Sequence, residues 1–261
     1  MEDNDRPLNQ QEFTKYRAAC GKLVWLSEQS RPDLAYDVIE LTGHNKNAQV
    51  RHLKQLNKVL KKSKEFPGEI RYSRIGNYED LKILVIADAS YLKKDDKTKS
   101  VMGKLIFLTN SKEEFVSPIL WKSKTIQTVC KSPKAAETRA VDKAIENAIY
   151  VARSIREIYT GDRGEKQIPV DVRTDSQSLI DSVESTKQID DHLLRPLVKF
   201  MKQALDARWI NNLTWCDTNV CLADVLTKTA APLSRTLVNV MKTGQMIDLN
   251  ESQKKKSVGK K

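Results

Sequence analysis

The chain of 261 residues is poor in cysteine and has no long run of apolar residues. Its cysteines are only Cys20, Cys130, Cys216 and Cys221, none in a CxxC spacing, and nothing near them completes a zinc ligand set. This argues against a structural zinc or redox module and favours free thiols in a reducing compartment. No apolar stretch approaches the length of a membrane span, and the acidic opening "MEDNDRPLNQQEF" resembles neither a secretory signal nor a transit peptide. We therefore expect an intracellular protein, cytoplasmic or nuclear, with no membrane partner.

Acidic residues are scarcer than basic ones. The chain has 34 Asp and Glu against 45 Lys and Arg, which gives a formal net charge of +11. Such a balance suggests a polyanionic partner such as nucleic acid, although many basic proteins bind nothing of the kind. Apolar residues recur with regular spacing almost throughout, so we expect a folded chain with one ordinary domain and a smaller appendage.

Residues 1–68 are predicted to form the appendage, a small helical segment. Apolar residues recur near the 3.6-residue period after Gln11, and a second helix is expected between Pro32 and Gly43. A third helix, around residues 48–64, has a basic outer face with no acid in it. That face consists of Arg51, Lys54, Lys58, Lys61, Lys62 and Lys64. It is either a solvated helix face or a phosphate-binding surface, for which Lys54, Lys58 and Lys61 are the candidates.

Residues 69–248 are predicted to form an α/β domain. Strands are expected at 69–75, 81–90, 100–109, 113–123, 168–175 and 210–218, with a shorter one around 125–130. Helices are expected at 132–159, 176–183, 190–207, 221–229 and 232–244. A block of strands followed by alternating helices and strands indicates a mixed sheet with helices on both sides. Residues 249–261 are polar and basic and are predicted to be a disordered tail.

Four carboxylates interrupt apolar sequence in the second part of the chain. Asp88 follows "ILVIA", Glu137 lies early in an Ala-rich helix, Asp175 ends a strand, and Asp224 lies within "CLADVL". Buried carboxylates without partners are costly, so a group of them is best explained by a cation. Hard divalent ions such as Mg²⁺ prefer oxygen ligands of this kind.

Three of these acids also have ordinary explanations. Asp175 could be the N-cap of the helix at 176–183, and Asp224 could complement a helix dipole. Glu137 could be a surface acid near a helix start. Asp88 is harder to explain, because an acid inside a strand caps nothing.

The order of the motifs resembles a known family. "IADAS", "AAETRA", "RTDSQ" and "LADVLTK" resemble the four acidic motifs of the ribonuclease H domain at the end of Ty1/copia-type retrotransposon polyproteins. "SRPDLAYDV" is similar to the segment that follows the polymerase core there, and "ILWKSK" to the third strand of the nuclease. The resemblance extends from about Tyr16 to Gly244.

The resemblance implies a fold and an activity. The fold would be a ribonuclease H-like mixed five-stranded sheet flanked by helices, after a segment like the connection that joins polymerase to nuclease. Two Mg²⁺ ions, for which Mn²⁺ could substitute, would be held by Asp88, Glu137, Asp175 and Asp224. The enzyme would hydrolyse the RNA strand of RNA/DNA hybrids, and a polymerase portion of the same element would be a further partner.

The resemblance also suggests where the hybrid would bind. Ser90, Ser176 and Gln177 adjoin the acids and are candidates for contacting a 2′-hydroxyl, although they could equally be ordinary polar turn residues. Lys122 and Lys124 are candidates for contacting phosphates.

The sequence departs from the family pattern in one place. Many ribonucleases H have a histidine in the loop before the last Asp, and "WCDTNVCLAD" has none. His44, His52 and His192 lie in predicted helices or at their ends and are interpreted as structural or surface groups. The sequence also contains no YxDD polymerase motif. The alternative to a nuclease is a nucleic-acid-binding or connecting fragment of a retroelement polyprotein that keeps the fold without turnover.

Overall fold

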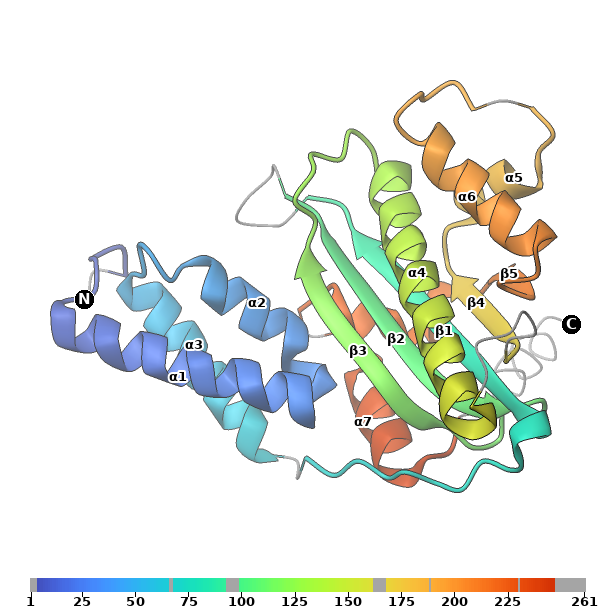
Figure 1. Ribbon diagram of the computed structural model, residues 1–261. Coiled ribbons are helices and arrows are strands. Elements are labelled where there is room, and N and C mark those ends of the chain that lie inside the picture. Colours follow the sequence, from blue (N-terminus) through green and yellow to red (C-terminus); the bar gives the residue numbers. More distant parts are fainter. Residues whose placement is uncertain are drawn as a thin grey trace, which may run out of the picture.

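Five strands form one mixed sheet in the computed structural model (Figure 1), which describes residues 4–65, 68–92, 99–161, 168–187, 189–229 and 231–246. The strands are β1 (Leu81–Ser90), β2 (Val101–Asn110), β3 (Ser117–Thr125), β4 (Val170–Thr174) and β5 (Asn212–Trp215), in the order β3-β2-β1-β4-β5. Strands β1, β2 and β3 are antiparallel neighbours, whereas β4 and β5 run parallel to β1. This arrangement confirms the predicted ribonuclease H-like sheet.

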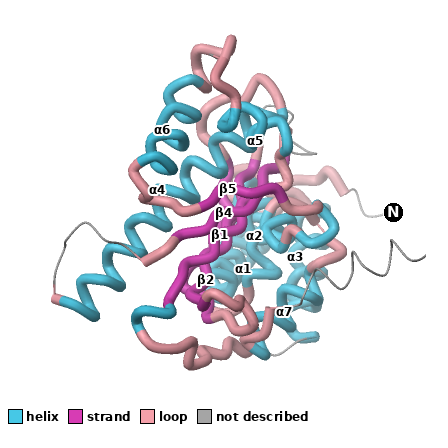
Figure 2. The backbone as a smooth tube through the Cα atoms, turned by 90° about the vertical axis from the view of Figure 1, so that its right-hand side faces the viewer, coloured by secondary structure: helices cyan, strands magenta, loops and turns pink. Residues whose placement is uncertain are grey.

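Three helices cover one face of the sheet (Figure 2). They are α4 (Pro133–Thr160), α5 (Gln177–Glu184) and α6 (Arg195–Asp206). The helix α4 presents Ala144, Ala148 and Ala152 to β1, where Ile83, Val85 and Ala87 are fully buried. Small side chains let this helix approach the strands closely, which fixes the position of everything that α4 carries.

The opposite face is covered by short elements near the end of the chain. They are the 3-10 helix η4 (Leu222–Leu226) and the helix α7 (Ser234–Thr243), which ends at Gly244 in the left-handed conformation with φ 66°. Another 3-10 helix, η3 (Thr218–Val220), precedes η4 and has no buried residue. The apolar side chains of η4 and α7 pack on Leu84, Ile86 and Phe107 of the sheet. Burial on both faces explains the continuous apolar run in β1.

The first part of the chain is helical, as predicted. It contains α1 (Gln10–Gln29), the 3-10 helix η1 (Pro32–Leu34), α2 (Ala35–Gly43) and α3 (Val50–Glu65) around a core of their own. It is joined to the edge strand β3 through Trp121, whose indole nitrogen donates to the carbonyl of Ser27 at 2.8 Å, and through an ion pair between Lys122 and Glu28. The contact positions the helical segment beside β3 (Figure 1).

The basic face predicted for the third helix is only partly confirmed. Lys54, Lys58 and Lys61 lie on exposed positions of α3. The prediction is wrong for Lys62, which turns inward and pairs with Asp37 at 2.9 Å. The ammonium also donates to the main-chain carbonyl of Asp33 at 2.8 Å, so this lysine holds α3 to α2 and η1.

Two predicted strands and one predicted helix are absent from the described residues. Residues 69–75 run without regular secondary structure, because their hydrogen bonds are single contacts, such as Arg71 N to Met241 O at 2.8 Å, rather than a ladder. Residues 126–130 form a bend after β3 and bury only Ile126 and Cys130. In place of the helix predicted at 221–229, the structure has only the shorter 3-10 helix η4. A short 3-10 turn, η2 (Tyr78–Asp80), precedes β1. The predicted basic tail, 249–261, lies outside the described residues.

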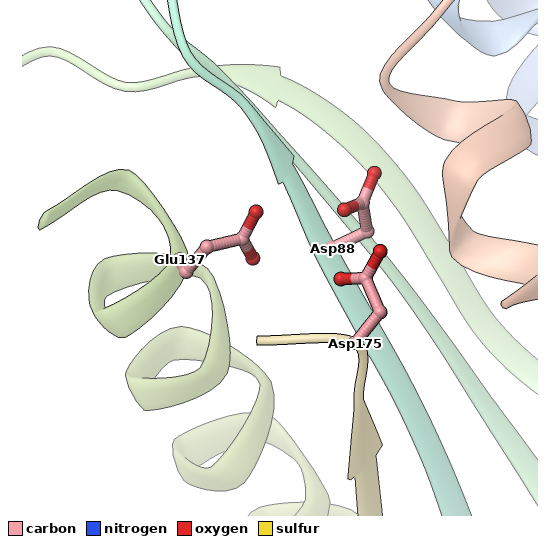
Figure 3. A group of neighbouring side chains, drawn as sticks. All are labelled: Asp88, Glu137 and Asp175. Atoms are coloured by element: carbon pink, nitrogen blue, oxygen red, sulfur yellow. The ribbon is translucent and has the colours of Figure 1, made fainter. Parts of the chain in front are cut away.

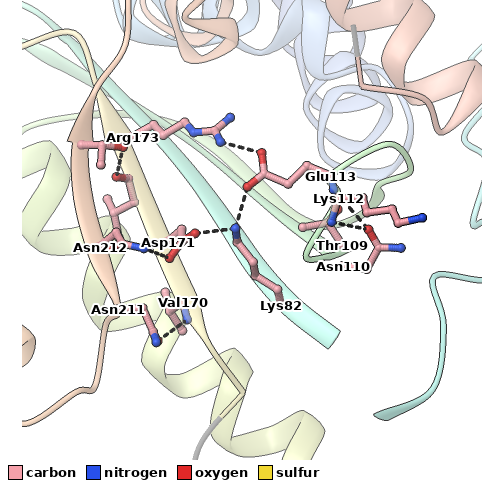
Figure 4. Close-up of polar contacts among 12 residues, drawn as sticks. Lys82, Thr109, Asn110, Lys112, Glu113, Val170, Asp171, Arg173, Asn211 and Asn212 are labelled. Atoms are coloured by element: carbon pink, nitrogen blue, oxygen red, sulfur yellow. Dashed lines mark hydrogen bonds and ion pairs between the residues drawn. The ribbon is translucent and has the colours of Figure 1, made fainter. Parts of the chain in front are cut away.

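Alternating charges occupy the end of the sheet farthest from the carboxyl end of β1 (Figure 4). Lys82 pairs with Asp171 and, at 2.7 Å, with Glu113, which in turn accepts from Arg173 at 2.5 Å. Asn212 donates to Asp171 at 2.9 Å. Because each charged side chain in this group faces one of opposite sign, the charges of Lys82, Asp171, Glu113 and Arg173 neutralise one another. This mutual neutralisation explains the presence of these charged residues without a catalytic or binding role.

Candidate metal centre

Three carboxylates converge at one edge of the sheet (Figure 3). Asp88, Glu137 and Asp175 each offer an oxygen atom, and these atoms all lie within 4.8 Å of one another. The side chains come from β1, from α4 and from the residue after β4, and they point toward a common space. The sequence separates them widely, so the fold alone brings them together.

The pairing of β1 with β4 explains why two of the acids meet. The strands are parallel, and Ile86 lies opposite Arg173. Two residues farther along each chain are Asp88 and Asp175, so both acids lie at the carboxyl ends of neighbouring strands. Glu137 lies in the first turns of α4, and its buried neighbours Ala136 and Ala140 pack close to the end of β1. The sequence alone does not show this strand register and helix packing, which bring the three acids together.

Asp224 lies beside this group but is not part of it. It is buried in η4, and its carboxylate forms an ion pair with Lys228. Thr227 connects the two regions, because its hydroxyl donates to Asp88 and also lies 3.2 Å from the main-chain oxygen of Asp224. The structure thus gathers three of the four predicted acids and holds the fourth next to them by a lysine.

Gly103 allows η4 to reach Asp88. It lies opposite Asp88 in the pairing of β1 with β2. A Cβ atom at this position would be 2.7 Å from Cβ of Leu226, 2.8 Å from Cγ2 of Thr227 and 2.9 Å from the carbonyl oxygen of Ala223. Only glycine fits under η4 at this spacing, so this residue sets the distance between η4 and the strand that carries Asp88.

The electrostatics of the group are unfavourable without a cation. The pKa of Asp88 is raised to about 6, mainly by burial and to a smaller extent by the charges of Asp175 and Asp224, while Thr227 and Lys228 act in the opposite direction. Burial, followed by the charges of Asp88 and Asp175, raises the pKa of Glu137 to about 9. One carboxylate oxygen of Glu137, Oε2, is buried without a hydrogen-bond partner. Several buried carboxylates, one of them with an unsatisfied oxygen, fit a hard divalent cation such as Mg²⁺.

Lys228 already supplies one positive charge. Burial lowers the pKa of its ammonium, but the ion pair with Asp224 and the charges of Asp88 and Asp175 outweigh burial and raise it. Lys228 therefore remains charged and partly neutralises the site. The sequence reasoning missed this residue, although the i, i+4 spacing from Asp224 is a signal for such a pair.

Glu137→Gln is expected to raise the melting temperature of the metal-free protein by about 5 °C near about pH 8. The pKa of Glu137 in the folded protein, about 9, exceeds its ordinary value of 4.5, so the folded state keeps a proton that the unfolded chain releases. Its contribution to stability is complete below about pH 4.5 and is lost as the pH rises to about 9. Glutamine cannot ionise and should flatten this dependence.

Thermal unfolding followed by circular dichroism between about pH 5 and 9 in a chelator measures this effect. Added Mg²⁺ should recover stability in the unmodified protein and much less in the variant. Equal pH dependence of the two proteins would contradict the expectation.

Asp175 does not cap the helix that follows it. The N-cap of α5 is Ser176, and its side chain forms no capping hydrogen bond. One carboxylate oxygen of Asp175 accepts from Thr218 at 2.8 Å, and its main-chain carbonyl accepts from the indole nitrogen of Trp215 at 3.1 Å. The ordinary interpretation of this acid is therefore wrong, and two residues that the sequence analysis did not single out hold it in place.

The predicted substrate-contacting residues are dispersed. Ser90 ends β1 close to Asp88, and Ser176 directly follows Asp175. Gln177 is exposed and donates to Asp181 at 2.8 Å within its own helix. Lys122 and Lys124 lie on β3, whereas Lys54, Lys58 and Lys61 lie on α3, which packs mainly on α1 and α2.

No protein-family model matches the chain, and no curated protein matches it by sequence. Among solved structures, ribonuclease H1 from the halophilic archaeon Halobacterium salinarum is similar, with 15% identity and a TM-score of 0.41 over 56% of this chain and 94% of that one. LC11-RNase H1, solved in complex with an RNA/DNA hybrid, has 16% identity and a TM-score of 0.39 over 56% of this chain and 93% of that one.

A foamy viral protease-reverse transcriptase, solved with double-stranded DNA, has 12% identity and a TM-score of 0.37 over 83% of this chain and 42% of that one. Since all these TM-scores are below 0.5, the assignment of the fold rests on strand order and direction.

No helix among the described residues has the length and apolar character of a membrane span.

Proposed function

We propose that the chain is a metal-dependent ribonuclease H of a Ty1/copia-type retrotransposon, which hydrolyses the RNA strand of RNA/DNA hybrids. The observation that carries the proposal is the convergence of Asp88, Glu137 and Asp175 at the carboxyl ends of β1 and β4 within a ribonuclease H-like sheet. The order of the acidic motifs in the sequence supports the same assignment.

The acids would act as metal ligands, with Mg²⁺ as the expected ion and Mn²⁺ as a substitute. A bound pair of divalent ions would supply an activated water and stabilise the leaving oxygen of an in-line phosphodiester displacement. Asp88, Glu137 and Asp175 hold oxygen ligands in position before any ion arrives. Asp224 lies beside these ligands with one carboxylate oxygen paired with Lys228, and we propose that it joins the site when ions bind.

Neighbouring residues keep the ligands in position. Thr227 donates to Asp88, and Thr218 donates to Asp175, so each acid has one oxygen fixed and the other available. Ser90 and Ser176 lie next to these acids in the chain and remain our proposed contacts to the 2′-hydroxyl of the RNA strand.

Incubation of a labelled RNA/DNA hybrid with the protein and Mg²⁺ tests the proposal. The RNA strand should be cut to products with a 3′-hydroxyl and a 5′-phosphate, the DNA strand should stay intact, and a chelator should stop the reaction. Equal cutting of double-stranded DNA, or no cutting with either Mg²⁺ or Mn²⁺, would contradict it. Tight binding of the hybrid without cleavage would instead favour a silent nucleic-acid-binding fragment.

A further inference from the structure

The helix α4 leaves part of the sheet uncovered. It packs on β1, β2 and β4. On this face, the register of the neighbouring strands β2 and β3 places Lys104 opposite Lys122 and Met102 opposite Lys124. A cleft of about 650 Å³ opens over these residues, and its lining also includes Lys143 and Asn147 of α4. We call this cleft the basic trough and define it by Lys104, Lys122, Lys124 and Lys143.

The positive charge of the basic trough is only partly neutralised. Lys122 pairs with Glu28, and Lys143 pairs with Glu146 at 2.7 Å. Within the described parts of the chain, neither Lys104 nor Lys124 forms an ion pair with a carboxylate.

Among the residues that the structure describes, the ammonium of Lys104 contacts neutral groups only. It contacts the side-chain oxygen of Asn147 and lies 3.3 Å from the main-chain oxygen of Lys143. The pKa of Lys104 is lowered to about 8, mainly by burial and also by Lys143, Lys124 and Lys122, against the opposing charge of Glu146. A lysine gathered with three others in a partly buried place costs stability, and an anion would remove that cost.

The trough and the candidate metal centre share the helix α4, since Lys143 lies six residues after Glu137, about 9 Å along the helix axis. Asp88 itself leaves the sheet on the opposite face, toward η4. Met102, in the lining of the trough, lies opposite Ala89, the residue after Asp88. It packs against the apolar cluster that contains Ala136, the neighbour of Glu137. From Ile119 to Lys124, the lined part of β3 spans about 16.5 Å at roughly 3.3 Å per residue. One strand of a duplex is a regular row of negative charges, so several phosphates can lie along a surface of this length.

We propose that the basic trough binds backbone phosphates of the same duplex whose scissile strand lies at Asp88, Glu137 and Asp175. The inference rests on the proposed function in taking that duplex as the ligand, and it adds Lys104 and Lys143 to the binding surface. The trough has a sheet floor and four amine donors, and it shares α4 with the candidate metal centre, which suits a regular row of phosphates better than an acidic peptide.

Equilibrium binding of the full chain to a hybrid of about 18 base pairs, measured in a chelator over a range of salt concentrations, tests the proposal. The Lys104→Gln, Lys124→Gln double variant should weaken binding and reduce the slope of log K against log salt by about 1.8, or about 0.9 per lost phosphate contact. Lys124→Gln alone, at an exposed position, should reduce the slope by about 0.9 and tests the trough without altering a partly buried residue.

A Lys15→Gln, Lys242→Gln double variant is the matched control. It removes the same charge from exposed positions on α1 and α7, and it should leave the slope unchanged. An equal fall in slope for both pairs, or a fall in neither, would overturn the trough as a specific site.

Glu28→Gln should act in the opposite direction. It frees Lys122 from its ion pair, so the slope should steepen by about 0.9 and the hybrid should bind more tightly. Weaker or unchanged binding would argue against phosphate contact by Lys122.

The outcomes separate this inference from the proposed function. Binding in a chelator does not depend on hydrolysis, so a chain that cleaves nothing can still show the difference in slope between the trough variant and its control. In that case the trough stands and the nuclease proposal fails. If the chain cleaves the hybrid and the slopes do not differ, the trough fails and the nuclease proposal stands.

Discussion

Asp88→Asn is expected to lower the rate of hybrid cleavage by about three orders of magnitude. Asp88 lies centrally in the site, since it neighbours Glu137 and Asp175 and is linked through Thr227 to the segment that carries Asp224. Asparagine keeps the shape and can still accept from Thr227, but it removes the negative charge that holds a cation. Loss of a metal ligand costs several kcal/mol of transition-state stabilisation, and each 1.4 kcal/mol is about a factor of ten in rate.

Single-turnover cleavage of a labelled hybrid in Mg²⁺ measures this effect, and Asp142→Asn provides a matched control. Asp142, like Asp88, is a buried carboxylate, and it lies on α4. Burial, together with Glu146, raises its pKa to about 6. It lies outside the group of three acids, so its substitution should leave the cleavage rate within about twofold of the original, as for most changes that touch no reacting group.

Two results would contradict this interpretation. Cleavage by Asp88→Asn at the unmodified rate would show that the acids are not the reacting centre. An equal loss in Asp142→Asn would show that removing any buried acid is enough to disturb the protein.

The sequence was a good guide to the sheet where apolar residues form long runs. Leu81–Ser90 and Val101–Asn110 are buried for most of their length, and the first was predicted from its continuous apolar run. Burial on two faces leaves a continuous apolar signal that local sequence can carry. An acid such as Asp88 then stands out because nothing local requires it.

Elements held by isolated contacts could not be predicted in the same way. Residues 69–75 have strand-like composition, yet Asn110 and Ser117 bond to single carbonyls of this segment, those of Ile75 and Ser73, at 3.1 and 3.0 Å. Whether such a segment forms a ladder depends on the edge that it meets, which is a tertiary property.

The candidate metal centre was predictable only in part. Each acid could be found as a carboxylate in apolar sequence, but the meeting of Asp88 with Asp175 depends on the parallel register of β1 and β4. The pairing of Asp224 with Lys228 lies within one short segment and could have been read from its spacing. Its importance comes from the other three acids nearby, which spacing alone does not reveal.

Gly103→Ala is expected to lower hybrid cleavage by about 100-fold while leaving the sheet folded. The added methyl would lie 2.7 Å from Cβ of Leu226 and 2.9 Å from a main-chain oxygen, so η4 must move away from β2. Thr227 and Asp224 would move with it, and the hydroxyl that fixes Asp88 would be displaced. A misplacement of about 1 Å in a reacting site can cost about a hundredfold in rate.

The same substitution at Gly21 separates this effect from the general consequence of adding a methyl group. Gly21 lies inside α1, and a Cβ there would meet nothing within 4 Å. Gly21→Ala should therefore stabilise the protein by roughly 0.5–1 kcal/mol, because alanine loses less conformational freedom in a helix, and cleavage should not change. Circular dichroism of both variants and single-turnover cleavage give the comparison. If Gly103→Ala cleaved as fast as Gly21→Ala, the close approach of η4 to β2 would be unnecessary for the reaction.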